Sequence, residues 1–86
     1  MKIERLNELT REYMWLKEIV EAHSELIRII TEREGYFRVS SICDGETSYS
    51  INPHHSIPDK YLIDGLKASV DNCKKRMQEI KVLCEY

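Results

Sequence analysis

The first third of the chain carries a hydrophobic pattern that alternates steps of three and four residues. This pattern runs from Leu6 to Ile30 and contains no glycine or proline. Such a seam is typical of a helix whose apolar stripe packs against another helix. We therefore predict one long helix over residues 3–33. The members of its seam are Leu6, Leu9, Tyr13, Leu16, Val20, His23, Ile27 and Ile30.

A second apolar row runs beside this seam, at steps of four, three, four and three. Together the two rows are roughly twice as wide as a two-stranded coiled coil requires. One helix of the same chain covers only one row, so the second row predicts contact with another chain in a homodimer or higher oligomer. Tryptophan, here Trp15, is enriched among residues that dominate interface energies. The predicted interface residues are Trp15, Ile19, Ala22, His23, Leu26 and Ile29.

Residues 36–51 predict a β-hairpin, because β-branched and aromatic residues flank the turn sequence Cys43-Asp44-Gly45. Gly35, just before it, is expected to end the first helix, since glycine readily adopts the left-handed conformation found there. An isolated two-stranded hairpin is marginal in water, and both its edges are unpaired. It therefore packs either on a helix or against the hairpin of a second copy.

The hairpin admits two registers. A two-residue turn at Asp44-Gly45 would place Val39 opposite Ser50 and scatter apolar residues over both faces. A three-residue loop with a left-handed Gly45 places Val39 opposite Tyr49 and gathers the apolar residues on one face. We predict this second register, because a slip of one residue would turn the apolar set toward solvent. It also pairs Phe37 with Ile51 and Ser41 with Thr47.

Residues 52–57 are predicted to form a loop, and a second helix is predicted over residues 58–85. Pro58 is expected as its first helical residue, or Asp59 as its cap. The narrow seam of this helix fits one row of the first helix in an antiparallel arrangement, and consists of Ile63, Leu66, Val70, Cys73, Met77, Ile80 and Cys84. The predicted fold is a single domain over residues 1–86, mostly α within the α+β class. Two long, coiled-coil-like antiparallel helices are joined by a β-hairpin.

Composition and charge narrow the expected partners. The 86 residues are 42% hydrophobic and 33% charged, with a net charge of −2 at pH 7. Nucleic-acid binders usually carry a basic stripe, so nucleic acid is not an expected partner. The longest apolar run is far below the roughly 20 residues that cross a bilayer, so no membrane partner is expected. Three cysteines, an odd number, and a first segment without the apolar run of a secretory signal favour reduced thiols and a cytoplasmic location.

Few residues suggest chemistry. His54 and His55 with Cys43 are of metal-ligand type, but adjacent residues of an extended chain point in opposite directions. We therefore expect no metal and no cofactor. Because the sequence ties no base to any cysteine, we also expect no enzymatic activity. A single polar residue in a seam, here His23, commonly specifies register or oligomeric state.

Two function classes stay open beside the main one. We expect a non-enzymatic protein that binds another macromolecule as an inhibitor, adaptor or assembly factor, a format common among accessory proteins of phages and other mobile elements. The first alternative is an oligomeric binder of a small anionic ligand, built around the only basic cluster. Its candidate residues are Arg38, Ser48, Tyr49, Ser50, His54, His55, Lys74, Lys75 and Arg76. The second alternative is a regulatory nucleic-acid binder, whose affinity would depend strongly on salt.

Overall fold

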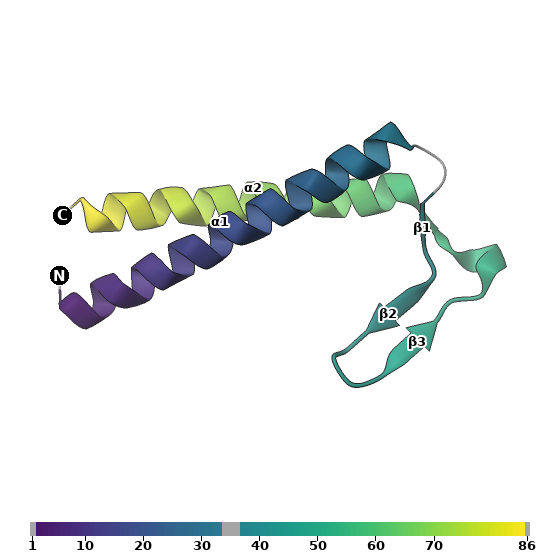
Figure 1. The fold of residues 1–86 in the computed structure, drawn as a ribbon, viewed down its shortest axis with the longest axis horizontal. Helices are drawn as coiled ribbons and strands as arrows, with labels where there is room; N and C mark the ends of the chain where they lie inside the picture. The colour runs from purple at the N-terminus through teal and green to yellow at the C-terminus, as the bar shows by residue number, and fades with distance from the viewer. Residues whose placement is uncertain (1, 34–36, 86) are drawn as a thin grey trace.

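The computed structural model describes residues 2–33 and 37–85, which form two long helices joined by short antiparallel strands (Figure 1). Helix α1 spans Ile3–Glu32 and helix α2 spans Asp59–Cys84. The helices pack side by side and run antiparallel, so the two chain termini lie at the same end of the pair. This confirms the predicted fold, mostly α within the α+β class. The predicted helix end at Gly35 and the predicted hairpin start at Tyr36 lie outside the described residues.

The two seams form the core between the helices. Leu9, Leu16, Cys73 and Ile80 are buried together. Tyr13, Ile19, Val20 and Met77 pack around them, partly buried. We call the end of the helix pair where the chain termini lie the open end. The seam positions nearest to it, Leu6 and Cys84, are exposed. The three-four spacing thus correctly predicts which face of each helix meets the other, because both seams repeat once per two helical turns.

Helix α2 begins one residue later than predicted. Pro58 is its N-cap residue, in an extended conformation with φ −60° and ψ 152°, and Asp59 is its first helical residue. Pro58 cannot be helical because it also belongs to strand β4, Ile57–Pro58, which pairs with strand β1, Arg38–Val39. Asp59 is buried in the first turn, where the helix dipole favours a carboxylate.

Strands β1 and β4 connect the strand region to helix α2. They pair antiparallel, with Arg38 opposite Pro58 and Val39 opposite Ile57, and both strands contact α2. Val39 therefore does not pair with Tyr49, as the predicted register had it. It does not pair with Ser50 either, as the alternative register had it. Residue 57, predicted as loop, is a strand residue. The segment before it contains a short 3₁₀ helix, Pro53–His55, capped by the Asn52 side chain, which accepts a 2.9 Å hydrogen bond from the N–H of His54.

Beyond β1 and β4, strand β2, Ser41–Cys43, pairs with strand β3, Ser48–Ser50. The pairs are Ser41 with Ser50, Ile42 with Tyr49 and Cys43 with Ser48, so the predicted register was wrong. Its error lies in the loop, which consists of Gly45 and Glu46. Gly45 does have the expected positive φ, +97°, at the first loop position, where a type II′ turn places glycine.

The side chain of Asp44 explains this loop. Its Oδ1 accepts hydrogen bonds from the N–H groups of Glu46, at 3.0 Å, and Thr47, at 2.8 Å. The N–H of Asp44 in turn donates to the carbonyl of Thr47, at 3.2 Å. These bonds hold the pKa of Asp44 below its usual value, because its ionised form accepts two backbone donors. They pair Asp44 with Thr47 and so shift every pair of the hairpin.

The molecule is elongated and thin. Its dimensions are 53 × 31 × 14 Å, and α1 crosses α2 in the view along the shortest axis, so the two packed helices are stacked along that axis (Figure 1). The radius of gyration is 16.9 Å, whereas a compact chain of this length has about 12 Å. All residues of β2 and β3 are exposed, and this hairpin stands away from the helix pair (Figure 1).

Candidate functional site

The outer row of α1, defined as Trp15, Ile19, Ala22, Leu26 and Ile29, is only partly covered by α2. Trp15 is 60% exposed and Leu26 is 45% exposed, and Ala22 is exposed as well. Ile19 and Ile29 are half-buried, and Ile19 packs against the core from the side. The row therefore leaves an aromatic and an aliphatic side chain of α1 in contact with water.

His23 joins the outer row to α2. Its Nδ1 and the Oγ of Ser69 are hydrogen-bonded at 2.9 Å, and both side chains are half-buried. The seam pattern identified His23 as the polar position, but Ser69 was missed. Ser69 is the neighbour of the seam residue Val70, so the sequence alone predicts that its side chain faces solvent. The structure supplies a polar partner for the imidazole across the helix pair.

An open groove of about 370 Å³ lies beside this hydrogen bond. Helix α2 lines it with Tyr61, Gly65 and Ser69, and α1 lines it with His23. The remaining lining is apolar and comes from Val39, Ile57, Leu62 and Leu66. A mostly apolar groove with a few polar groups is the usual character of a binding site.

The outer row and the groove belong to one face of the helix pair. Trp15, Ile19 and His23 are spaced by four residues, so they follow one ridge of α1, and Tyr61, Gly65 and Ser69 follow one ridge of α2 by the same spacing. The His23–Ser69 hydrogen bond brings these two ridges together. We call the side of the helix pair formed by these ridges the outer face.

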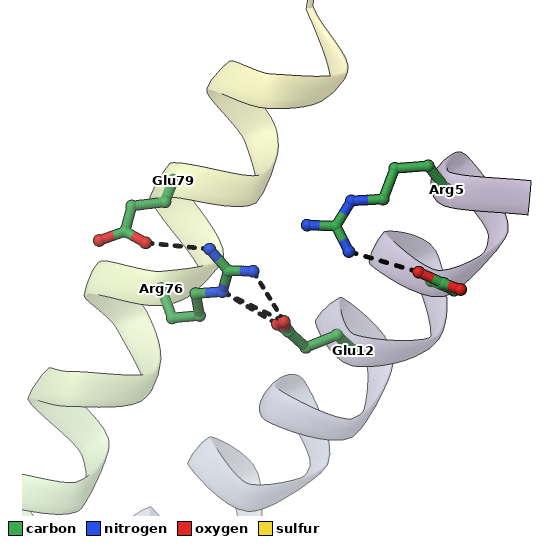
Figure 2. A network of polar contacts seen from close by, with 5 residues as sticks. Arg5, Glu12, Arg76 and Glu79 are labelled. Atoms are coloured by element: carbon green, nitrogen blue, oxygen red, sulfur yellow. Dashed lines mark hydrogen bonds and ion pairs between the residues drawn. The ribbon is translucent and has the colours of Figure 1, made fainter. Parts of the chain in front are cut away.

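Toward the open end of the pair, an ion pair joins α1 and α2. Arg76 donates to both carboxylate oxygens of Glu12, with Nε and Nη2 contacts at 2.9 Å, and its Nη1 donates to Glu79 at 3.1 Å (Figure 2). These hydrogen bonds hold the pKa of Glu12 below its usual range, since Arg76 favours the ionised carboxylate. They also raise the pKa of Arg76. The guanidinium is therefore engaged by two carboxylates of the chain itself.

The nine residues predicted for an anionic ligand are not gathered in one place. Lys74 and Lys75 are exposed, and together with Arg76 they begin fifteen residues after the start of α2, roughly 22 Å along its axis. Arg38 is exposed in β1 near that start. The hydroxyl residues Ser48, Tyr49 and Ser50 form β3 on the projecting hairpin. His54 and His55 are exposed on the 3₁₀ helix.

Within residues 2–33 and 37–85, no group of three or more His, Cys, Asp or Glu side chains is placed to hold a metal ion. Cys73 is buried in the core, whereas Cys43 and Cys84 are exposed and far apart in the fold. Across the same residues, neither helix contains an apolar stretch long enough to span a membrane.

Comparisons of the chain with known protein families, with curated proteins and with solved structures find no match.

Proposed function

We propose that this chain is a homo-oligomeric, non-enzymatic interaction protein of the cytoplasm. It associates with a second copy through the outer face of its helix pair. It acts by binding another macromolecule, as an inhibitor, adaptor or assembly factor.

The exposed apolar side chains of the outer row carry this proposal. Trp15 and Leu26 are 60% and 45% exposed, although the two helices already enclose a core between them. Large apolar side chains exposed on one face mark an interaction surface. A second helix pair packed on the outer face covers both of them.

The exposed area supports the same conclusion. The chain exposes 6971 Å², whereas a compact monomer of this mass exposes about 5,300 Å². The excess, roughly 1,700 Å², is of the size that each subunit of an obligate homodimer buries, since such interfaces total about 2,000–5,000 Å². A second copy suits this face because identical surfaces associate most simply about a two-fold axis.

The β2–β3 hairpin is the surface proposed for the macromolecular partner. Ile42 and Tyr49 form a cross-strand pair and are 56% and 57% exposed. Neither helix covers this pair, and the strand edges lack the charged or proline residues that discourage pairing with another chain. The hairpin projects from the end of the helix pair away from the chain termini and bends back beside the helices without packing into their core (Figure 1).

Sedimentation equilibrium of the full chain tests self-association. The wild type is expected to sediment as a dimer or a larger oligomer. Leu26→Glu buries a charge in the proposed interface, so it should raise the dissociation constant at least 100-fold. Ser24→Glu makes the same change in charge on an exposed position of α1 outside the outer row and should leave the mass unchanged. Equal masses for wild type and Leu26→Glu would contradict the proposal.

Partner binding is tested by isolating the protein from cells together with what it carries. A macromolecule bound through the hairpin should be recovered with the wild type and lost with the double variant Ile42→Ser and Tyr49→Ser. The double variant should keep its helical signal and its oligomeric mass, because both residues are exposed and lie outside the core between the helices. Equal recovery with both proteins would exclude the hairpin as the docking surface.

A further inference from the structure

We infer that Trp15 of each copy inserts into the groove of the other copy, between His23, Gly65 and Ser69. This inference rests on the proposed self-association, and it names the contact that fixes the arrangement of the two copies.

Trp15 and the groove both lie on the outer face. Within a single chain the indole is exposed and the groove is open. Trp15 is the most exposed member of the outer row, and the groove lies on the same side of the helix pair, beyond Ile19 and beside His23. The His23–Ser69 bond and the Glu12–Arg76 ion pair of the antiparallel helices together place Gly65 beside roughly residue 25 of α1, about ten residues from Trp15. That separation is roughly 15 Å, too far for Trp15 to reach the groove of its own chain.

A two-fold axis makes the contact reciprocal. When the axis lies between two stacked outer faces at about the level of residue 20, it places each Trp15 at the height of the other copy's Gly65. The two Ile19 side chains then meet near the axis, where two half-buried aliphatic residues form an apolar centre. One operation thus fills both grooves and covers both indoles, as an isologous interface requires.

The groove suits an indole in shape and chemistry. Its lining is mostly apolar, and an aromatic side chain buries roughly 150–250 Å² when it is enclosed. The indole N–H needs an acceptor, and Ser69 Oγ and the His23 ring lie at the rim. Aromatic anchors seated in a pocket at the centre of an interface commonly dominate its affinity.

Gly65 leaves space open in the groove. A Cβ built at this residue meets no atom of the described residues within 4 Å, so their packing does not require a glycine there. Glycine in the middle of a helix is nevertheless unfavourable, because it loses more backbone entropy than any other residue. A docked indole from a second copy gives this glycine a purpose, since a larger side chain would occupy the indole's space.

Gly65→Leu tests the contact without removing any group from the monomer. The variant should fold, with a melting temperature of its monomeric form no lower than that of the wild type, because a Cβ at this residue meets no described atom within 4 Å and leucine favours a helix more than glycine does. It should raise the dissociation constant at least 100-fold in sedimentation equilibrium, as should Trp15→Ala. The matched control Lys67→Leu adds a leucine to the exposed side of α2 away from the groove and should leave the dissociation constant unchanged.

Fluorescence of the wild type, whose only tryptophan is Trp15, provides an independent measurement. The emission should be blue-shifted and protected from iodide in the oligomer, and both properties should be lost on dilution in parallel with the mass. A wild-type oligomer with an iodide-accessible indole, or with a Gly65→Leu dissociation constant equal to its own, would overturn this inference and leave self-association standing. A wild type that stays monomeric at every concentration would overturn the proposed function and this inference together.

Discussion

His23 on α1 and Ser69 on α2 are hydrogen-bonded at 2.9 Å, although 46 residues separate them in the chain. This bond lies near the strand end of the helix pair, and the Glu12–Arg76 ion pair lies toward the open end. Apolar seams alone allow two helices to slide past one another by two turns, because the three-four spacing repeats every seven residues. Two polar contacts at separate heights select one axial alignment.

The His23–Ser69 bond predicts a measurable coupling between the two side chains. In a double-mutant cycle of His23→Phe and Ser69→Ala, the coupling free energy should be about 1 kcal/mol, the net contribution of a typical intramolecular hydrogen bond. Chemical denaturation of the four proteins measures it. Single-variant losses that add without coupling would show that the two groups do not depend on each other.

The core predicts a large difference between two aliphatic truncations of α1. Leu9 is 1% exposed, so Leu9→Ala should lower the free energy of unfolding by about 2–5 kcal/mol, which is a substantial part of the stability of a small domain. Ile3 is 77% exposed, and Ile3→Ala should change that free energy by less than about 0.5 kcal/mol. Urea denaturation followed by helical circular dichroism compares them. Similar losses at both positions would contradict the assignment of the core.

The Glu12–Arg76 ion pair predicts a dependence of stability on pH. The pKa of Glu12 is lowered in the folded chain below its ordinary value of 4.5, so its stabilising effect is complete above about pH 4.5. That effect is lost as the pH falls through the lower pKa of the folded form, because the carboxylate becomes protonated there. The melting temperature of the wild type should therefore drop between pH 5 and pH 2.

Glu12→Gln isolates this contribution. The amide is neutral at every pH, so the variant should melt below the wild type at pH 7 and approach it at pH 2. Glu18→Gln, at an exposed position of α1, serves as the control and should keep the wild-type pH profile. A Glu12→Gln profile parallel to that of the wild type would show that the ion pair does not contribute.

The turn of the projecting hairpin predicts a local effect. Asp44→Ala removes the acceptor of the Glu46 and Thr47 N–H groups, so the β2–β3 pairing should loosen while both helices remain. Amide hydrogen exchange should accelerate at Ile42 and Tyr49 and stay unchanged in the middle of α1 and α2. Exchange that is unchanged at Ile42 and Tyr49 would contradict the role of this side chain.

Both helices and their contact faces could be predicted from the sequence because one physical rule decides them. A step of three or four residues returns a side chain to the same face of a helix. When this spacing continues over roughly thirty residues, the two-residue period of a strand does not fit the pattern. The end of the second helix seam was less certain. Cys84 fits the spacing but is exposed, in the last turn of α2.

The strand region could be predicted in kind but not in register. Three-residue strands carry too few side chains for their alternation to outweigh a single strong local contact. The hydrogen bonds that the Asp44 carboxylate accepts are that contact, and they place the two-residue loop at Gly45 and Glu46. The pairing of Val39 with Ile57 was missed for another reason, because a strand ending in Pro58 reads as a loop before a helix.

The candidate site was predicted only in part. The spacing of the apolar residues predicted the outer row. Trp15 and Leu26 of this row are exposed, so α2 does not cover them. The groove could not be inferred, because it combines Val39 and Ile57 from paired strands with both helices. Its one sequence signal is Gly65, an unexplained glycine inside an otherwise regular helix.

Native mass spectrometry of the untagged protein, isolated from a cytoplasm, tests the central claim most directly. The chain has a mass of 10.2 kDa, and the account predicts that the main species carries twice this mass or a larger multiple. The spectrum should keep this multiple at low micromolar concentration. A main species of one chain mass under those conditions would contradict the association of two outer faces.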